Sequence, residues 1–235
     1  MRDYCEKAAG ERMNLDGFFR YPVDELPFVV LTILIAFTVH EFSHAYFAYK
    51  FGDRTAYDAG RVTLNPRVHL DILGTILILI AGFGWAKPVP VNPSRFKYPR
   101  LMGIVVSAAG PISNLLIGAV GMFIYYVLLR NGVLMDGSRG VIMAVHTFFG
   151  YLISINLLLF VFNLIPLPPL DGYRIIADLL PLRLRYKLDQ NAQWGSLIFL
   201  ILVFVPALRR VTLDPILNLS GDIFLWLDSL YRSIL

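Results

Sequence analysis

The sequence has little cysteine and little charge. Cys5 is the only cysteine among 235 residues, and only 16% of the residues are charged. A single cysteine excludes an internal disulfide framework and a zinc site built from cysteine ligands, so metal ligands would have to be histidines and carboxylates. Ordinary soluble domains are about 25% charged. The low charge, with 57% hydrophobic residues and a mean hydropathy of +0.62, indicates an integral membrane protein.

The first 26 residues lack the apolar stretch of a cleavable signal peptide and mix basic with acidic side chains. We therefore expect 1–26 to be an extracytoplasmic N-terminal tail and the first apolar segment to direct insertion. No PDZ-like or CBS-like segment is evident, and the length leaves little room for a separate soluble domain. The expected organisation is a membrane-embedded domain over 27–208 and an amphipathic C-terminal tail over 209–235.

Long apolar runs predict an all-α polytopic membrane protein with about four transmembrane helices. A helix needs about 20 residues to cross the hydrocarbon core. The segment 72–86 is too short for this and carries three glycines, so we interpret it as a re-entrant element; 194–208 is borderline. The apolar runs cover 28–49, 72–86, 101–129, 148–170 and 194–208.

Basic residues support the re-entrant interpretation through the positive-inside rule. If 72–86 turns back, twelve of the 21 basic residues share one side of the membrane, whereas a full crossing would place the basic 87–100 loop outside. The shared side should be cytoplasmic, with the N-terminus outside. The twelve are Lys50, Arg54, Arg61, Arg67, Lys87, Arg95, Lys97, Arg100, Arg174, Arg183, Arg185 and Lys187.

The C-terminal tail places apolar residues at helical spacing from Pro215 onward. This pattern predicts an amphipathic helix on the membrane surface, and packing of the same helix against the membrane helices is an equally good interpretation. The apolar positions are Ile216, Leu219, Ile223, Leu227 and Leu230.

The motif His40-Glu41-Phe42-Ser43-His44 lies inside the apolar run 28–49. Residues four apart share a helix face, so both imidazoles can bind one metal ion while Glu41 lies on the same side. H-E-x-x-H on a helix is typical of hydrolytic zinc sites. A chance match is the alternative, but a Glu and two His within a membrane-length segment are costly unless they serve a site.

Zinc needs a third protein ligand, and Asp171 is the strongest candidate. It follows a proline-rich stretch that begins at Asn163 and precedes Gly172. Three prolines cannot continue a helix, so the backbone should unwind there and turn the carboxylate sideways. A solvated Asp at a helix end is the plain alternative. His69 and His146 are rival ligands, although each is more typical of a hydrogen-bonded or interfacial histidine.

Together these motifs resemble the site-2 protease family of membrane-embedded zinc metallopeptidases, in a compact form. The resemblance covers about residues 28–180 and includes the stretches 60–66, 71–75, 84–90 and 110–114. It implies that His40, His44 and Asp171 bind Zn²⁺ and that Glu41 is the catalytic base. One departure is Ile72, where the family often has proline.

The resemblance also gives expectations for the remaining polar segments. It implies a small membrane-associated β-hairpin over Gly60–Val68, for which an ordinary loop is an equally good interpretation. It makes Asn114 and Asn163 candidates for substrate or oxyanion contacts, although a buried asparagine that steadies a neighbouring helix is the default.

The expected function is an intramembrane zinc metalloprotease that hydrolyses peptide bonds within or near transmembrane segments. A zinc transporter and a catalytically silent membrane scaffold are the alternatives. We expect transmembrane proteins as substrates, contact with the lipid bilayer, and no nucleic acid. A homo-oligomer or a regulatory membrane partner stays open. The expected location is a prokaryotic cell membrane, with the active site facing the cytoplasm.

Overall fold

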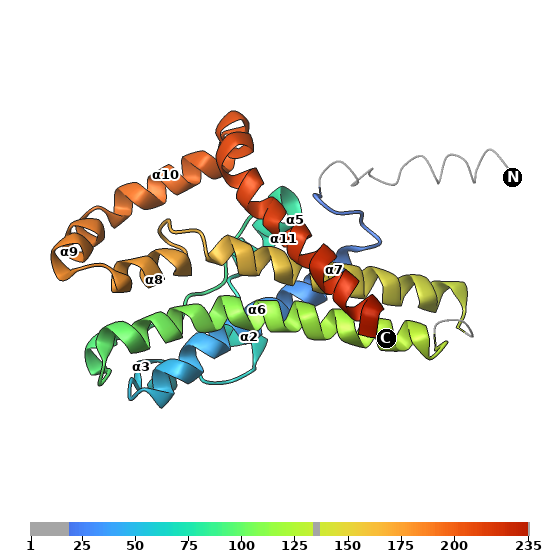
Figure 1. Ribbon diagram of the computed structural model, residues 1–235, viewed down its shortest axis with the longest axis horizontal. Helices are drawn as coiled ribbons and strands as arrows, with labels where there is room; N and C mark the ends of the chain where they lie inside the picture. Colours follow the sequence, from blue (N-terminus) through green and yellow to red (C-terminus); the bar gives the residue numbers. More distant parts are fainter. Residues whose placement is uncertain (1–18, 134–136, 235) are drawn as a thin grey trace, which may run out of the picture.

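The computed structural model describes residues 19–133 and 137–234, and within these ranges the chain forms helices and no strands (Figure 1). The predicted all-α class is therefore confirmed. The elements are α2 (Leu26–Lys50), α3 (Thr55–Asp58), α4 (Pro66–His69), α5 (Ile72–Ala81), the 3₁₀ turn η2 (Pro93–Arg95), α6 (Pro99–Arg130), α7 (Arg139–Asn163), α8 (Asp171–Leu179), α9 (Leu182–Gln190), α10 (Ala192–Phe204) and α11 (Pro206–Ile234).

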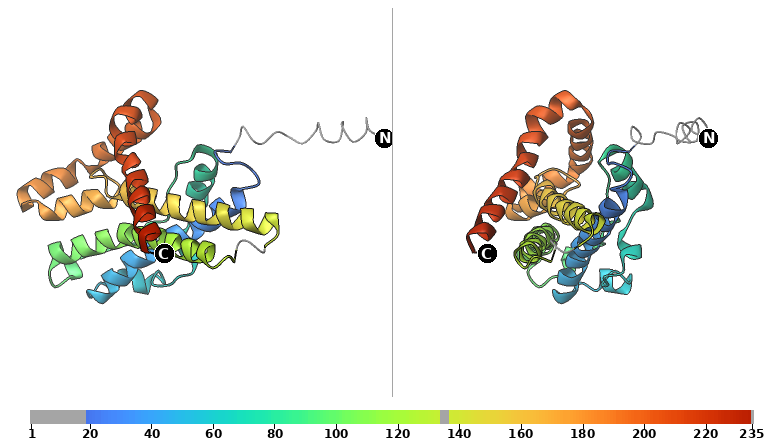
Figure 2. Two further views of the ribbon diagram at one scale, coloured as in Figure 1. Left: turned by 45° about the vertical axis from the view of Figure 1, so that its right-hand side comes forward. Right: turned by 90° about the vertical axis from the view of Figure 1, so that its right-hand side faces the viewer.

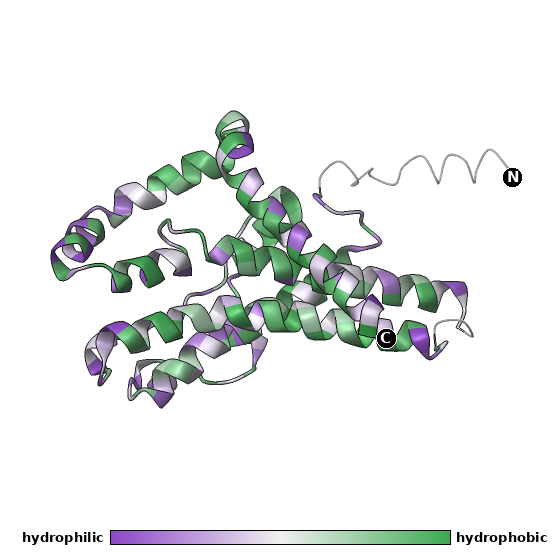
Figure 3. Ribbon diagram, in the orientation of Figure 1, coloured by the Kyte–Doolittle hydropathy of each residue, from purple (hydrophilic) through white to green (hydrophobic). Residues whose placement is uncertain are grey.

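In the described part of the chain, three helices, α2, α6 and α7, are long and apolar enough to cross a membrane. They pack against one another and form the centre of the molecule (Figure 2). The pair α10 and α11 would count as a fourth crossing if it were one broken span, but the two helices meet at a bend of 99°. Hydrophobic residues run along the long helices and hydrophilic residues gather near their ends (Figure 3), as expected for membrane-embedded helices.

The third long helix begins and ends earlier than the apolar run 148–170 suggests. Ser138 caps its start by accepting a hydrogen bond from the Val141 N–H. It ends at Asn163, before the three prolines of 164–170. Because proline lacks an N–H and its ring clashes with the preceding turn, the helix cannot extend through this stretch, as the sequence predicted.

The predicted β-hairpin over Gly60–Val68 is wrong, because the described chain forms no strand there. Instead, Asn65 accepts a hydrogen bond from the Arg67 N–H and caps the short helix α4. Pro66 occupies the first position of that helix, where its missing N–H costs nothing. The family resemblance implied the hairpin, with an ordinary loop as the equal alternative, but the Asn-Pro pair is a helix-start signal.

The segment 72–92 turns back on itself, which is the geometry that a re-entrant element requires. Asp71 caps α5 by accepting from the Gly74 N–H, and Gly82 ends the helix with a positive φ of 72°. Ten residues of helix span only about 15 Å. The return segment reaches its starting point, where the Lys87 N–H donates to the His69 carbonyl at 2.8 Å.

The end of α2 is tied to the return segment by the buried carboxylate of Asp53. This carboxylate accepts hydrogen bonds from the Asn92 N–H at 2.6 Å and the Thr55 N–H at 3.0 Å. Burial alone would raise the pKa of Asp53, but these hydrogen bonds and Arg95 outweigh it and hold the pKa below its usual value. The segment that follows α5 is thereby fixed beside α2.

The last helix packs against the membrane helices. Leu227 of α11 is buried with Met122 of α6 and with Ile153 and Leu157 of α7, and the Tyr231 hydroxyl donates to the Ala119 carbonyl at 3.1 Å. Of the two interpretations of the C-terminal tail, the structure therefore favours packing on the helices. This helix begins at Pro206, so it already runs through residue 209, where the sequence predicted the C-terminal tail to begin. Most of the predicted N-terminal tail, residues 1–18, lies outside the described ranges.

Candidate metal centre

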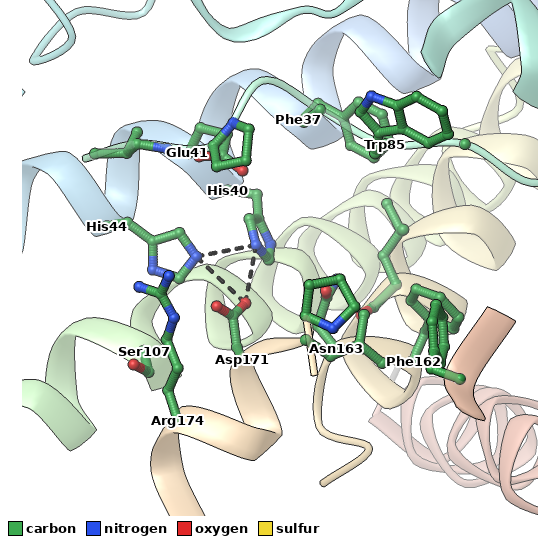
Figure 4. A pocket seen from close by; sticks show the side chains of 18 of the residues that line it. Phe37, His40, Glu41, His44, Trp85, Ser107, Phe162, Asn163, Asp171 and Arg174 are labelled. Carbon is green, nitrogen blue, oxygen red and sulfur yellow. Dashed lines mark hydrogen bonds and ion pairs between the residues drawn. The ribbon is translucent and has the colours of Figure 1, made fainter. Parts of the chain in front are cut away.

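His40, His44 and Asp171 converge at one point in the interior (Figure 4). One potential ligand atom from each residue lies within 4.8 Å of the other two. The Asp171 Oδ2 atom is 3.2 Å from His40 Nε2 and 3.3 Å from His44 Nε2, and the two Nε2 atoms are 3.0 Å apart. Two imidazoles and one carboxylate are a donor set that zinc accepts in catalytic sites.

Local sequence explains how the three side chains meet. The two histidines lie four residues apart on α2 and so share one face. Asp171 is the first residue of α8, directly after the proline-rich turn that ends α7. Gly172 is required beside it, because a Cβ there would overlap the backbone of Leu164 and Ile165.

Each histidine has its other ring nitrogen occupied. His44 Nδ1 lies 2.7 Å from the Val106 carbonyl, and His40 Nδ1 lies 2.6 Å from Asn114 Oδ1. A carbonyl oxygen can only accept, so His44 carries its hydrogen on Nδ1 and leaves the Nε2 lone pair free. Outer partners of this kind are typical of metal-binding histidines. The site therefore fits a zinc ion by its donors and by their orientation.

Glu41 lies beside this group and is 8% exposed. Its Oε2 atom accepts a hydrogen bond from the Val89 N–H at 2.9 Å. Because Pro88 and Pro90 have no N–H, Val89 supplies the only backbone donor between positions 88 and 90. Arg61 holds the same segment by donating to the carbonyls of residues 87 and 88.

A cavity of about 310 Å³ opens onto the candidate ligands and Glu41. Its walls are mainly apolar and come from α2, α6, α7, α8, α10, the segment 83–91 and the turn before α8. Asn163 and Arg174 also line it and are drawn in Figure 4. The Asn163 amide donates to the Leu159 carbonyl at 3.0 Å. Apolar walls with a few polar groups are typical of ligand pockets.

The rival histidines do not join the metal group found among the described residues. His69 is fully buried and hydrogen bonded through Nε2 to the Thr63 carbonyl at 2.7 Å. The pKa of His69 is lowered mainly by its burial and further by the nearby positive charge of Arg61. His146 bonds to the Tyr125 hydroxyl, near the start of α7.

Asn114 is fully buried and contacts His40. Sequence reasoning did not single out Asn156, which is also fully buried and accepts a hydrogen bond from the Asn114 amide at 2.9 Å. The signal that could have found it is an asparagine inside the apolar run 148–170, where an unpaired polar group is costly.

Comparison with known proteins gives one family. The model of Peptidase family M50 matches residues 133–206. The "Putative zinc metalloprotease YwhC" of Bacillus subtilis (strain 168) is 50% identical over 215 residues, covering 92% of this chain and 97% of the relative. The "Putative zinc metalloprotease Rip2" of Mycolicibacterium smegmatis is 31% identical over 187 residues, covering 77% of this chain and 68% of the relative. No solved structure matches the chain.

Proposed function

We infer that this chain, which belongs to Peptidase family M50, the site-2 protease family, is a membrane zinc metalloprotease. The observation that carries the assignment is the convergence of His40, His44 and Asp171 beside Glu41 at one cavity. Two distant parts of the chain, α2 and the start of α8, would supply the three protein ligands of a catalytic zinc site and the carboxylate that hydrolysis needs.

In this proposal His40 Nε2, His44 Nε2 and an oxygen of Asp171 hold the Zn²⁺ ion. When bound, zinc supplies a Lewis acid that polarises a carbonyl and lowers the pKa of water to about 7. The buried hydrogen bonds at both Nδ1 atoms keep the imidazoles oriented toward the ion.

Glu41 is the proposed catalytic base. One of its oxygens, Oε2, accepts from the Val89 N–H, which orients the carboxylate and leaves Oε1 to take a proton from the attacking water. The same oxygen can return the proton to the leaving amine. The two prolines around Val89 make this segment stiff, so the donor stays in place.

The proposed substrates are transmembrane proteins cut within or near their membrane segments. The supporting features are the mainly apolar cavity walls and the position of His40 and His44 on α2, a candidate membrane span. Asn163 lines the cavity and is a candidate for substrate or oxyanion contacts. Asn114 is buried against His40, which favours a role in orienting the ligand over substrate contact.

The proposed location is a prokaryotic cell membrane, with the active site opening to the cytoplasm and the N-terminal tail outside. The basic residues support this orientation, because Arg54 and Arg95 lie beside Asp53 just after the end of α2, and Arg100 lies in the first turn of α6 at the same end of the long helices. A zinc transporter would need further ligands along a pathway, and the described part of the chain holds a single cluster of histidines and carboxylates that could bind a metal ion.

The decisive test pairs Glu41→Gln with Asp171→Ala in purified, reconstituted protein. Glu41→Gln should keep bound zinc and lose several orders of magnitude in peptide cleavage, because the base is gone but the ligands remain. Asp171→Ala should lose both zinc and cleavage, because two histidines alone do not close the site. The measurements are metal content and cleavage of a transmembrane substrate.

His146→Ala is the matched control, since His146 lies outside the metal group and should keep zinc and activity. Equal cleavage by wild type and Glu41→Gln would contradict the protease assignment. Zinc flux through proteoliposomes that is lost in Asp171→Ala, without any cleavage, would establish the transporter instead.

A further inference from the structure

The two candidate histidine ligands receive their outer hydrogen bonds in different ways. His44 Nδ1 meets a backbone carbonyl directly, at Val106. His40 Nδ1 meets the side-chain oxygen of Asn114. A backbone carbonyl can only accept a hydrogen bond, whereas a side-chain amide can rotate and present its donating NH₂ group in place of its oxygen. Something must therefore fix the Asn114 amide if His40 is to keep its hydrogen on Nδ1.

The structure contains a chain of buried hydrogen bonds that does this. Asn156 Nδ2 donates to the Leu152 carbonyl at 2.8 Å, and Asn156 Oδ1 accepts from Asn114 Nδ2 at 2.9 Å. Asn114 Oδ1 then lies 2.6 Å from His40 Nδ1. Both asparagines are fully buried, so water cannot substitute for a missing partner. The chain connects α7 through α6 to α2.

The polarity of every bond in this chain follows from its first member. The Leu152 carbonyl can only accept, so Asn156 must turn its NH₂ toward it and its oxygen toward Asn114. The Asn114 amide must then present its NH₂ to Asn156 and its oxygen to His40. A second carbonyl, at Ala36, lies 3.4 Å from the same Asn114 nitrogen and favours the same orientation. His40 is left with a hydrogen on Nδ1 and a lone pair on Nε2.

We propose that Asn156 is a positioning residue for the metal site, which acts through Asn114 to hold His40 in the tautomer that can bind zinc. This proposal rests on the proposed function only in taking His40 as a zinc ligand. Asn156 is neither one of the residues that line the cavity nor one of the candidate ligands. Its role is to set the orientation of the Asn114 amide, which is hydrogen bonded to the proposed zinc ligand His40.

The variant that tests the proposal is Asn156→Leu, which has similar size and no hydrogen-bonding group. The Asn114 amide would then lose its main orienting partner and could present its NH₂ to His40 Nδ1, which favours a hydrogen on Nε2. Zinc affinity should fall about 10-fold to 100-fold, the usual effect of losing an outer partner of a metal-binding histidine. Affinity is measured by competition with a chelator in detergent-solubilised protein.

Asn156→Asp is the variant that should rescue binding. A buried carboxyl is driven toward its neutral form, which can donate to the Leu152 carbonyl and accept from the Asn114 amide. The chain of bonds keeps its polarity, so zinc affinity should stay within about threefold of wild type. Ser154→Ala is the matched control for zinc binding: it removes a side chain from the same helix that also donates to a carbonyl four residues back, but is not connected to His40.

Two further measurements separate positioning from general destabilisation. Nitrogen-15 NMR of histidine-labelled, zinc-free protein reports the tautomer directly, and only four histidines have to be assigned. His40 should carry its hydrogen on Nδ1 in wild type and shift toward Nε2 in Asn156→Leu. In addition, Asn114→Leu combined with Asn156→Leu should lose no more affinity than Asn114→Leu alone, because both act through one path.

Unchanged zinc affinity and an unchanged His40 tautomer in Asn156→Leu would overturn the proposal, as would additive losses in the double variant. These outcomes differ from a failure of the proposed function. If His40 is not a zinc ligand, His40→Ala keeps full zinc binding, whatever Asn156 does.

Discussion

Gly110 shows how little space surrounds the metal-binding atoms. It lies on α6 where that helix crosses α2, and a Cβ built on it would overlap the Nε2 atoms of both His40 and His44. Carbon and nitrogen atoms normally keep about 3.5 Å apart. The absence of a side chain at this position is therefore part of the site, because the two lone pairs must face a shared open point.

Gly110→Ala should therefore displace one or both imidazoles and lower zinc affinity roughly tenfold or more, the scale of effect seen when histidine ligands lose their orientation. Gly150→Ala is the matched control, since a Cβ at Gly150 of α7 meets nothing within 4 Å. The measurement is zinc affinity by chelator competition. Retained affinity in Gly110→Ala would show that the helices can move apart at this crossing without cost.

The sequence identified the site residues that short local motifs mark. His40, Glu41 and His44 share one short motif, and Asp171 is marked by prolines before it and a glycine after it. The supporting residues escaped prediction because their roles depend on helix packing. Asn156, Val89 and Gly110 each act on a residue more than forty positions away, and nothing in their own neighbourhood reveals that partner.

At the level of elements, α5 and the segment that follows it form one hairpin that carries the donor to Glu41. The two arms touch backbone to backbone: a Cβ on Gly74 would overlap Trp85, and a Cβ on Gly84 would overlap Gly74. Sequence pattern predicted that this segment turns back, because it is too short to cross and rich in glycine. The β-hairpin that the family resemblance implied for the preceding segment is wrong, and the pattern could not decide against it, because strand and loop patterns are alike over a few residues.

Gly74→Ala should push the return segment away from α5 and disturb the Val89 N–H that orients Glu41 four residues beyond Trp85. A misplacement of about 1 Å at a catalytic group can cost about 100-fold in rate, so cleavage should fall about 10-fold to 100-fold. Zinc affinity should stay within about threefold, because α2 and α8 carry the ligands.

Gly140→Ala, with nothing within 4 Å of the added Cβ, controls for a glycine change in a helix. Cleavage and metal content are measured on the same preparations. If Gly74→Ala cleaves at the wild-type rate, the hairpin does not position Glu41. If zinc is lost together with cleavage, the hairpin supports the ligands as well.

At the scale of the whole molecule, the long helices have two ends with different connections. Asp53 bonds to Asn92 at one end, and Arg100, at the start of α6, donates to the carbonyls of residues 178–180 at the end of α8. The opposite end holds the last turn of α6 and the first turn of α7 (Figure 1). The end with Asp53 carries Lys50, Arg54, Arg95 and Arg100, which the sequence predicts to lie on the cytoplasmic side.

This arrangement predicts how single cysteines will react with a membrane-impermeant reagent. On a Cys5→Ser background, cysteines at Tyr57, Tyr98 and Leu182 should react from the cytoplasmic side, and a cysteine at Val133 from the outside. All four positions are exposed in the structure. Helix α6 has 32 residues and so spans about 48 Å, more than the hydrocarbon core of about 30 Å, which leaves its ends within reach of the reagent.

Labelling compares intact inverted vesicles with spheroplasts, and vesicles opened with detergent give the full signal. Reaction of Tyr57 and Tyr98 cysteines from opposite sides would mean that 72–86 crosses the membrane completely. Reaction of all three on the outer side, with Val133 inside, would keep the hairpin but reverse the protein, and the metal centre would then open away from the cytoplasm.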